Sequence, residues 1–135
     1  MMKESDLWAA LKRLPWDYAE RQEPGATNAG VPDVLLVHNG VIRFIELKNA
    51  VVNKQFCFKT TSLVRPSQIR WHRRFQAVSP ESYFLIGVGA NSRYLISGRF
   101  ARDLARGEYP ISDAYKVDVW SIEAILAHCN AMRGR

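Results

Sequence analysis

The sequence predicts a fold of the α/β (α+β) class, and three observations point to it. An amphipathic stretch opens the chain, two strand-like runs flank the dipeptide Asn39-Gly40, and a proline-initiated helix precedes a buried apolar run. With 135 residues and 47% hydrophobic content, the chain can form one core. We therefore expect one domain over residues 1–135, without internal repeats.

The first element is predicted to be a helix from Ser5 to Leu14. Ser5 can cap it, and Pro15 ends it because proline cannot continue a helix. One stripe of this helix is apolar, formed by Leu7, Trp8, Leu11 and Leu14. A strand can follow over 16–21, and the turn-forming residues of 24–30 predict a loop.

A β-hairpin is predicted next. Its strands are Asp33 to His38 and Val41 to Leu47, joined by Asn39-Gly40, the dipeptide favoured where both turn residues have positive φ. The segment 50–64 shows neither helical nor strand periodicity and is expected to be a loop or an irregular extension over the surface.

The second half is predicted to alternate again between helices and strands. A helix starts at Pro66 and runs to about Val78, with Gln68, Trp71, Phe75 and Val78 on its packed face. The further elements are a buried strand over 83–88, a strand over 93–96, a short helix over 100–106 and a helix over 121–132.

The positive charge is concentrated in one segment. The chain has a net charge of +6, and no Asp or Glu occurs between Asn49 and Pro80. That segment holds six basic residues, and the other 13 Lys and Arg balance the 13 Asp and Glu. The six candidate DNA-binding residues are Lys54, Lys59, Arg65, Arg70, Arg73 and Arg74. Such a surface is either a solvated basic face or a nucleic-acid contact.

Three ionisable residues are expected to converge at the open end of the hairpin. Glu46 and Lys48 share one face of their strand while Leu47 points into the core, because side chains alternate. Asp33 lies as far before the turn as Glu46 lies after it. Two close carboxylates repel unless a cation binds between them, so Asp33, Glu46 and the carbonyl of Leu47 are candidate ligands of Mg²⁺ or Mn²⁺. The alternative is a surface hairpin on which Glu46 and Lys48 form an ion pair.

These residues carry a family resemblance. Gly30-Val31-Pro32-Asp33, the hairpin, and then Ile45-Glu46-Leu47-Lys48 resemble the PD-(D/E)XK nuclease motif. With Ser67-Gln68 and Trp71 opening a later helix, the pattern is similar to the virus-type replication-repair nuclease (VRR-NUC) group, whose small stand-alone members occur in phages. The likeness covers about residues 4–88, and 90–135 carry no assignable motif. The segment 49–64 is longer than the family's usual linker.

The resemblance implies a restriction-endonuclease-like αβββαβ core, with a mixed central sheet flanked by helices. It also implies that Asp33 and Glu46 are metal ligands, that Lys48 is the catalytic lysine and that Gln68 lies near the site. Gln68 can instead serve as a capping or core residue. Another acidic residue is expected from the first helix. Glu4 is our candidate for it, Glu20 and Glu23 compete, and Glu4 can simply favour a helix N-terminus by its charge.

The predicted function is a metal-dependent, structure-selective DNA endonuclease acting on branched DNA such as four-way (Holliday) junctions. The alternatives are a sequence-specific or nicking endonuclease of the same fold and a non-catalytic basic DNA-binding protein. We expect a homodimer, with Trp120, Ile122 and Ile125 as candidate interface residues. We expect no membrane segment and no signal peptide, hence a cytoplasmic location, and reduced thiols at Cys57 and Cys129.

Overall fold

The computed structural model describes residues 2–22 and 30–133. The regular elements, in chain order, are α1 (Glu4–Lys12), β1 (Tyr18–Arg21), β2 (Val34–His38), β3 (Val41–Val52), β4 (Phe58–Thr60), α2 (Pro66–Gln76), β5 (Ser82–Val88), β6 (Ser92–Ser97), α3 (Ala101–Ala105), β7 (Tyr115–Lys116) and α4 (Ile122–Met132). Short 3₁₀ turns span Gly98–Phe100 and Ile111–Asp113.

The strands form one mixed sheet in the order β1-β2-β3-β5-β6-β7, and β4 pairs separately with the far end of β3. Only the β3–β5 pair is parallel among the described strands, and α2 lies on the connection between these two strands. The order α1, β1, β2, β3, α2, β5 is the αβββαβ core that the resemblance implies, with β4 as an addition. The predicted fold class is therefore confirmed.

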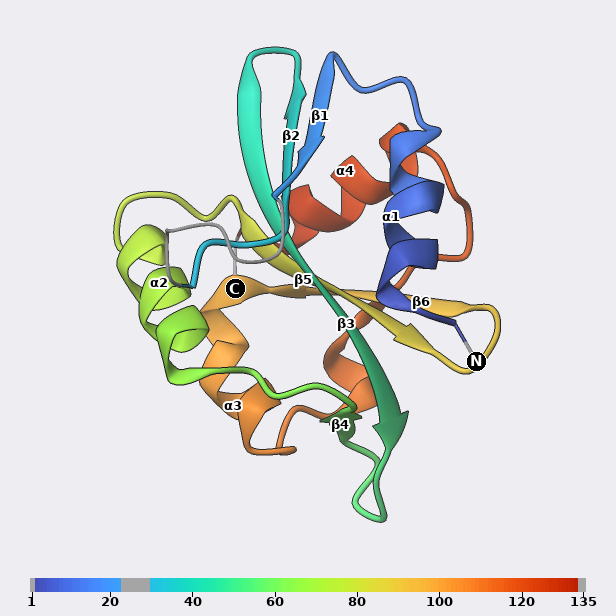
Figure 1. Ribbon diagram of the computed structural model, residues 1–135, viewed down its shortest axis with the longest axis vertical. Helices are drawn as coiled ribbons and strands as arrows, with labels where there is room; N and C mark the ends of the chain where they lie inside the picture. The colour runs from blue at the N-terminus through green and yellow to red at the C-terminus, as the bar shows by residue number, and fades with distance from the viewer. Residues whose placement is uncertain (1, 23–29, 134–135) are drawn as a thin grey trace.

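Helices cover both faces of the sheet (Figure 1). On one face, α1 and α4 pack over a core that includes Leu47 and Leu85. On the other face, α2 and α3 pack over a second core that includes Phe84 and Ile86. Leu47 points into a core, as predicted, and the strand that carries Glu46 and Lys48 is covered on both sides.

The hairpin prediction is confirmed at its turn. Asn39 has a φ of 50° and Gly40 a φ of 76°, the left-handed conformations that a two-residue turn of this kind requires. His38 pairs with Val41 and Val34 with Ile45, so the two strands stay in register along the whole of β2.

Several predicted boundaries are wrong. Helix α1 is capped at Lys3 and not at Ser5, because the Asp6 carboxylate accepts the Lys3 N–H at 2.7 Å. Val78 does not line the packed face of α2: the helix ends at Gln76 and Val78 is 83% exposed. Instead, buried His72 packs against Phe84 of the sheet.

The segment 50–64 is only in part the loop that we predicted, because 50–52 and 58–60 are strands. Strand β3 continues to Val52, and the chain returns as β4. The Asn53 side chain closes the turn between them, since its Oδ1 accepts the backbone N–H groups of Gln55 and Cys57 at 3.0 Å each. Phe58 is fully buried beside Tyr94 and Tyr109, which fixes the returning strand.

The residues after 90 belong to the same sheet and the same two cores. Ile122 and Ile125 are 4% and 2% exposed, and the Trp120 indole donates to the Ala10 carbonyl at 2.8 Å. Ile122 and Ile125 are buried within their own chain, so our choice of these two as interface residues is wrong, whereas half-buried Trp120 stays a candidate. Among the described residues, no helix has the length and apolar character needed to cross a bilayer.

Candidate active site

The hairpin register brings Asp33 and Glu46 together. Val34 pairs with Ile45, so the next pair of positions outward joins Asp33 to Glu46. The Asp33 carboxylate accepts the Leu47 backbone N–H at 3.2 Å, which holds Asp33 against the edge of β3. This convergence agrees with the geometry inferred from the sequence.

The site lies at an interruption in the edge of β3. Strand β2 pairs with this edge up to Ile45, and β4 pairs with it again from Ala50 onward. Between these two paired stretches, the Asp33 carboxylate accepts the Leu47 N–H, and the Asn49 carbonyl accepts hydrogen bonds from the backbone and side chain of Thr61. The N–H and C=O of one strand residue point the same way, so the Leu47 carbonyl faces the side on which Asp33 lies.

Glu46 is a buried carboxyl beside a second carboxyl. It is 2% exposed, and its Oε1 has no hydrogen-bond partner among the described residues. Burial raises the pKa of Glu46 well above its ordinary value, and the neighbouring Asp33 carboxyl raises it further, while Lys48 opposes the shift. A buried, unpaired carboxylate oxygen is costly for folding, and a bound cation would offset that cost.

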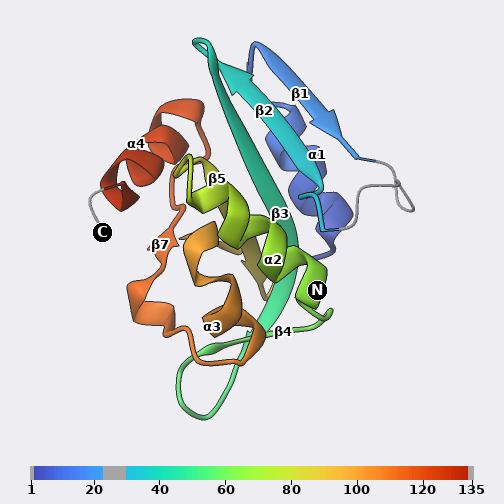
Figure 2. The same ribbon diagram turned by 90° about the vertical axis from the view of Figure 1, so that its left-hand side faces the viewer.

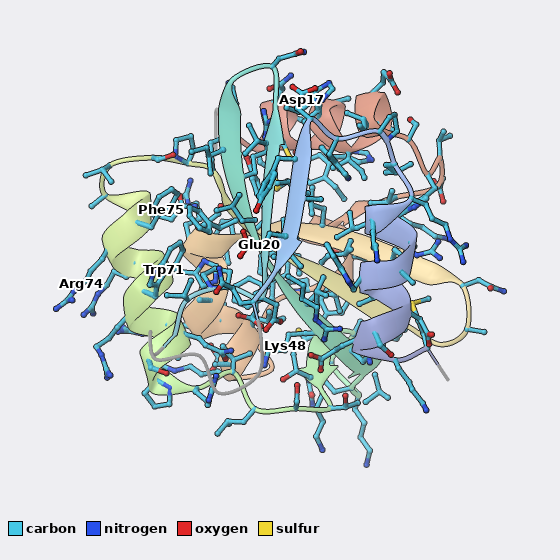
Figure 3. The ribbon with its side chains drawn as sticks, turned by 45° about the horizontal axis from the view of Figure 1, so that its top comes forward. Asp17, Glu20, Lys48, Trp71, Arg74 and Phe75 are labelled. Carbon is cyan, nitrogen blue, oxygen red and sulfur yellow. The ribbon has the colours of Figure 1, made fainter. Side chains whose placement is uncertain are left out.

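Lys48 is held in a defined position. Its Nζ donates to the Leu63 carbonyl at 3.0 Å and to Ser62 Oγ at 3.4 Å. An ammonium group has three donors, so one remains for a substrate or a water molecule. Figure 3 shows Lys48 below the end of β1, between α2 and α1.

Glu4 reaches the same site from the opposite face of the sheet. Ser62 Oγ donates to Glu4 Oε2 at 3.2 Å and thereby links Glu4 to Lys48, and the negative charge of Glu4 contributes to the raised pKa of Glu46. Glu20 is exposed and accepts a hydrogen bond from the Tyr18 hydroxyl at 2.6 Å. Of the acidic residues that we considered, Glu4 is thus the one in contact with the site, and Glu23 lies outside the described residues.

Gln68 is buried at the start of α2, where its Oε1 accepts the Arg65 backbone N–H at 2.9 Å. This is the capping contact that the sequence left open as an alternative. The first turn of α2 also packs against Gly30: a Cβ at Gly30 would lie 2.2 Å from the Ser67 carbonyl oxygen. The loop that delivers Asp33 is thereby fixed against the helix.

The metal ligands available here are few. In residues 2–22 and 30–133, no three His, Cys, Asp or Glu side chains gather closely enough to hold a metal ion by themselves. The set formed by Asp33, Glu46 and the Leu47 carbonyl contains two carboxylates and one peptide oxygen. Its hard oxygen donors suit Mg²⁺ or Mn²⁺, and water usually completes the coordination of such ions.

The six candidate DNA-binding residues are all exposed. Arg70, Arg73 and Arg74 on α2 are exposed, as are Arg65 before it and both Lys54 and Lys59 near β4. None of the ion pairs found in the described part of the chain includes them. Figure 2 shows α2 and the segment leading back to β4 along one side of the molecule. In Figure 3, Trp71 and Phe75 point from α2 toward the sheet, while Arg74 points away.

Comparison with solved structures shows a similarity in shape to a known nuclease. It is the Holliday junction resolvase Hjc of the archaeal hyperthermophile Archaeoglobus fulgidus, with a TM-score of 0.49 and 16% sequence identity over 92% of this chain and 89% of that one. No family model matches the chain, and no curated protein matches it. The likeness to the VRR-NUC group therefore rests on the sequence pattern alone. The similarity in shape assigns no role to any residue of this chain.

Sequence reasoning missed the partners of Lys48. Ser62 and Leu63 lie in the segment without periodicity, and nothing in their local sequence marks them. Their position follows from the return of the chain as β4, which is a tertiary contact. The close approach at Gly30 is different, because a glycine three residues before a candidate ligand is itself a signal of a tight contact.

Proposed function

We propose that this chain is a metal-dependent DNA endonuclease that hydrolyses phosphodiesters. The observation that carries the proposal is the pair of half-buried Asp33 and buried Glu46, with an unpaired Glu46 oxygen, beside a lysine held by two hydrogen bonds. Asp33, Glu46 and the Leu47 carbonyl would hold Mg²⁺ or Mn²⁺. When bound, such an ion would acidify a water molecule and neutralise charge on the scissile phosphate.

The protein's own groups would orient the reaction. Lys48, fixed by Ser62 and Leu63, directs its remaining donor at the attacking water or at the oxygen that gains charge. Ser62 also joins Lys48 to Glu4, so the lysine is positioned from both sides of the sheet. The exposed arginines of α2 and the two lysines near β4 would bind the flanking phosphates.

We further propose that the chain is a structure-selective enzyme of the PD-(D/E)XK superfamily and of its VRR-NUC group. We propose that it acts as a homodimer on branched DNA, four-way junctions above all. The residue pattern from Gly30 to Trp71 supports the superfamily. The basic surface supports recognition by phosphate position, which suits a substrate defined by shape.

Incubation with linear, nicked, flapped and four-way DNAs tests this function. We expect cleavage with Mg²⁺ or Mn²⁺, none in excess chelator, and faster cleavage of branched DNAs than of linear duplex. Full activity in chelator would rule out the mechanism. Equal rates on all DNAs would rule out the structure selectivity, and binding without any cleavage would favour the non-catalytic alternative.

A further inference from the structure

The β3–β4 finger (residues 51–59) lies in the segment without Asp or Glu, and the proposed function gives no role to Phe56 at its tip. Figure 1 shows the turn between β3 and β4 projecting at the bottom of the view, and Figure 2 shows the same projection from another side. Two lysines, Lys54 and Lys59, are exposed on it, and no acidic residue occurs within it. An anionic partner is therefore favoured.

Phe56 stands at the tip of the finger and is 72% exposed. It has a φ of 59°, in the left-handed region that phenylalanine rarely occupies. The exposed ring of Phe56 therefore does not contribute to either core. Sparsely populated backbone conformations are enriched at functional positions.

The backbone under the ring is fixed by the rest of the fold. The Phe56 carbonyl accepts the Ile111 N–H at 2.9 Å, and the Phe56 N–H donates to the Asn53 carbonyl at 3.1 Å. The Asn53 side chain donates to the Gly107 carbonyl at 3.0 Å, and Cys57 forms a β-bridge with Pro110. The segment after α3 thus braces the finger, so the backbone that carries the ring is already ordered before binding.

Strand β3 connects the finger directly to the candidate site. At a rise of ~3.3 Å per residue, the four steps from Lys48 to Val52 span about 13 Å. The turn adds several ångströms, so Phe56 lies roughly 15–25 Å from Lys48, or about four to seven nucleotides at ~3.4 Å each. One nucleic-acid arm can reach both.

We propose that Phe56 stacks on an unpaired or unstacked base at the branch point of the DNA, while Lys54 and Lys59 bind the adjacent phosphates. This inference rests on the proposed DNA substrate and names the element that would read its branched structure. Every base offers a π-face, so an aromatic platform recognises disrupted stacking without reading sequence. In an intact duplex the bases are stacked on each other, and the ring has no exposed base to contact.

Binding measurements in chelator, with 2-aminopurine placed at the branch of a four-way DNA, test the proposal. Phe56→Asn removes the ring and introduces a residue type that tolerates the left-handed conformation. We expect about a tenfold loss of affinity for the junction, the effect of one base stacked on an aromatic ring, and loss of the fluorescence change seen with wild type. Affinity for linear duplex should change by less than about twofold, because no stacked base is available to the ring.

Two matched variants serve as controls. Phe56→Tyr keeps a ring and should retain the fluorescence change and the junction affinity. Val119→Asn replaces another exposed apolar side chain, 64% exposed and outside the basic segment, and should bind like wild type.

Unchanged junction binding by Phe56→Asn would overturn the inference, as would an equal loss on linear duplex. A change in the sedimentation mass of the free Phe56→Asn protein would also overturn it, by assigning the ring to a contact with a second copy. If wild type neither binds nor cuts any of the DNAs, the proposed function itself fails. Wild-type cleavage with an unaffected Phe56→Asn variant would remove this inference alone.

Discussion

The two carboxylates of the candidate site have different structural roles. Asp33 completes the hydrogen bonding of the β3 edge through the Leu47 N–H, whereas Glu46 is buried with an unpaired oxygen. Glu46 therefore costs stability in the absence of a cation, and Asp33 contributes to it. Substitutions that preserve shape are needed to separate the chemistry from folding.

Asp33→Asn and Glu46→Gln are each expected to abolish Mg²⁺-dependent cleavage and leave DNA affinity nearly unchanged. Both remove a ligand charge without touching the basic residues, and the amide oxygen introduced by Asp33→Asn can still accept the Leu47 N–H. Lys48→Met should lower the rate by at least ~10², the lower end of the effect of a positioned acid-base group. Single-turnover cleavage and gel-shift binding on the same junction measure both quantities. Full activity of Asp33→Asn would contradict the assignment.

Glu4 and Glu20 form a matched pair of acidic residues. Glu4→Gln should reduce the cleavage rate, because Glu4 is joined through Ser62 to Lys48. Glu20→Gln should leave the rate within about twofold, because the exposed Glu20 carboxylate bonds to the Tyr18 hydroxyl and not to the site. Cleavage rates over a pH series at saturating Mg²⁺ compare the two variants. The reverse order of effects would move the third acidic position to β1.

At the scale of elements, α2 has two opposite faces. Trp71 and Phe75 pack on Phe44 of β3, with ring centroids 5.0 and 5.2 Å away, and His72 is fully buried against Phe84. The arginines occupy the outer surface. The helix thus attaches a positively charged surface to the strand that bears the site.

Replacing Arg70, Arg73 and Arg74 together with Gln should weaken DNA binding and flatten its salt dependence. Each lost phosphate contact removes about one unit of slope in a plot of log affinity against log salt concentration. Replacing Lys12, Arg13 and Lys116, three exposed basic residues on other elements, supplies a control of equal charge. An unchanged slope in the α2 variant would place the DNA on another surface.

His72 predicts a pH dependence of stability. Burial lowers the pKa of His72 to about 4, below its ordinary value near 6.5, so the folded state binds fewer protons than the unfolded state between these values. Stability is therefore complete above about pH 6.5 and falls, by at most ~1.4 kcal/mol per pH unit, as the pH drops toward 4. Urea unfolding of wild type and of His72→Gln from pH 4.5 to 7.5 should show a weaker dependence in the variant. Parallel pH profiles would contradict the assignment to His72.

At the scale of the whole molecule, each chain carries one candidate site, and a four-way junction requires two cuts for its resolution. A two-fold dimer would present two sites in a fixed relation. Sedimentation at micromolar concentration should give about twice the chain mass of 15.4 kDa, and junction cleavage should appear as paired incisions in opposing strands. A monomer that still makes paired incisions would refute the dimer, and a dimer that cuts only flaps or nicks would refute the substrate.

Local sequence signals predicted most of the fold and the centre of the site. The Asn39-Gly40 turn fixes the register that joins Asp33 to Glu46, and Pro66 fixes the start of α2. Prediction failed where distant contacts decide the structure. Strand β4 depends on Phe58 packing against Tyr94 and Tyr109, and Lys48 depends on Ser62 and Leu63, which that return strand brings into place.

The bond between Asp33 and the Leu47 N–H bears on how such chains would evolve. If the chain cleaves DNA as proposed, selection for a stable sheet and selection for cleavage would both act to keep Asp33, because the same carboxylate closes a gap in the strand edge. Glu46 would have no such second reason to persist, and a descendant released from cleaving DNA would gain stability by exchanging it for an apolar residue. Under the proposed function, an aspartate at this position in related genes would therefore mark the fold, and the buried glutamate would mark cleavage.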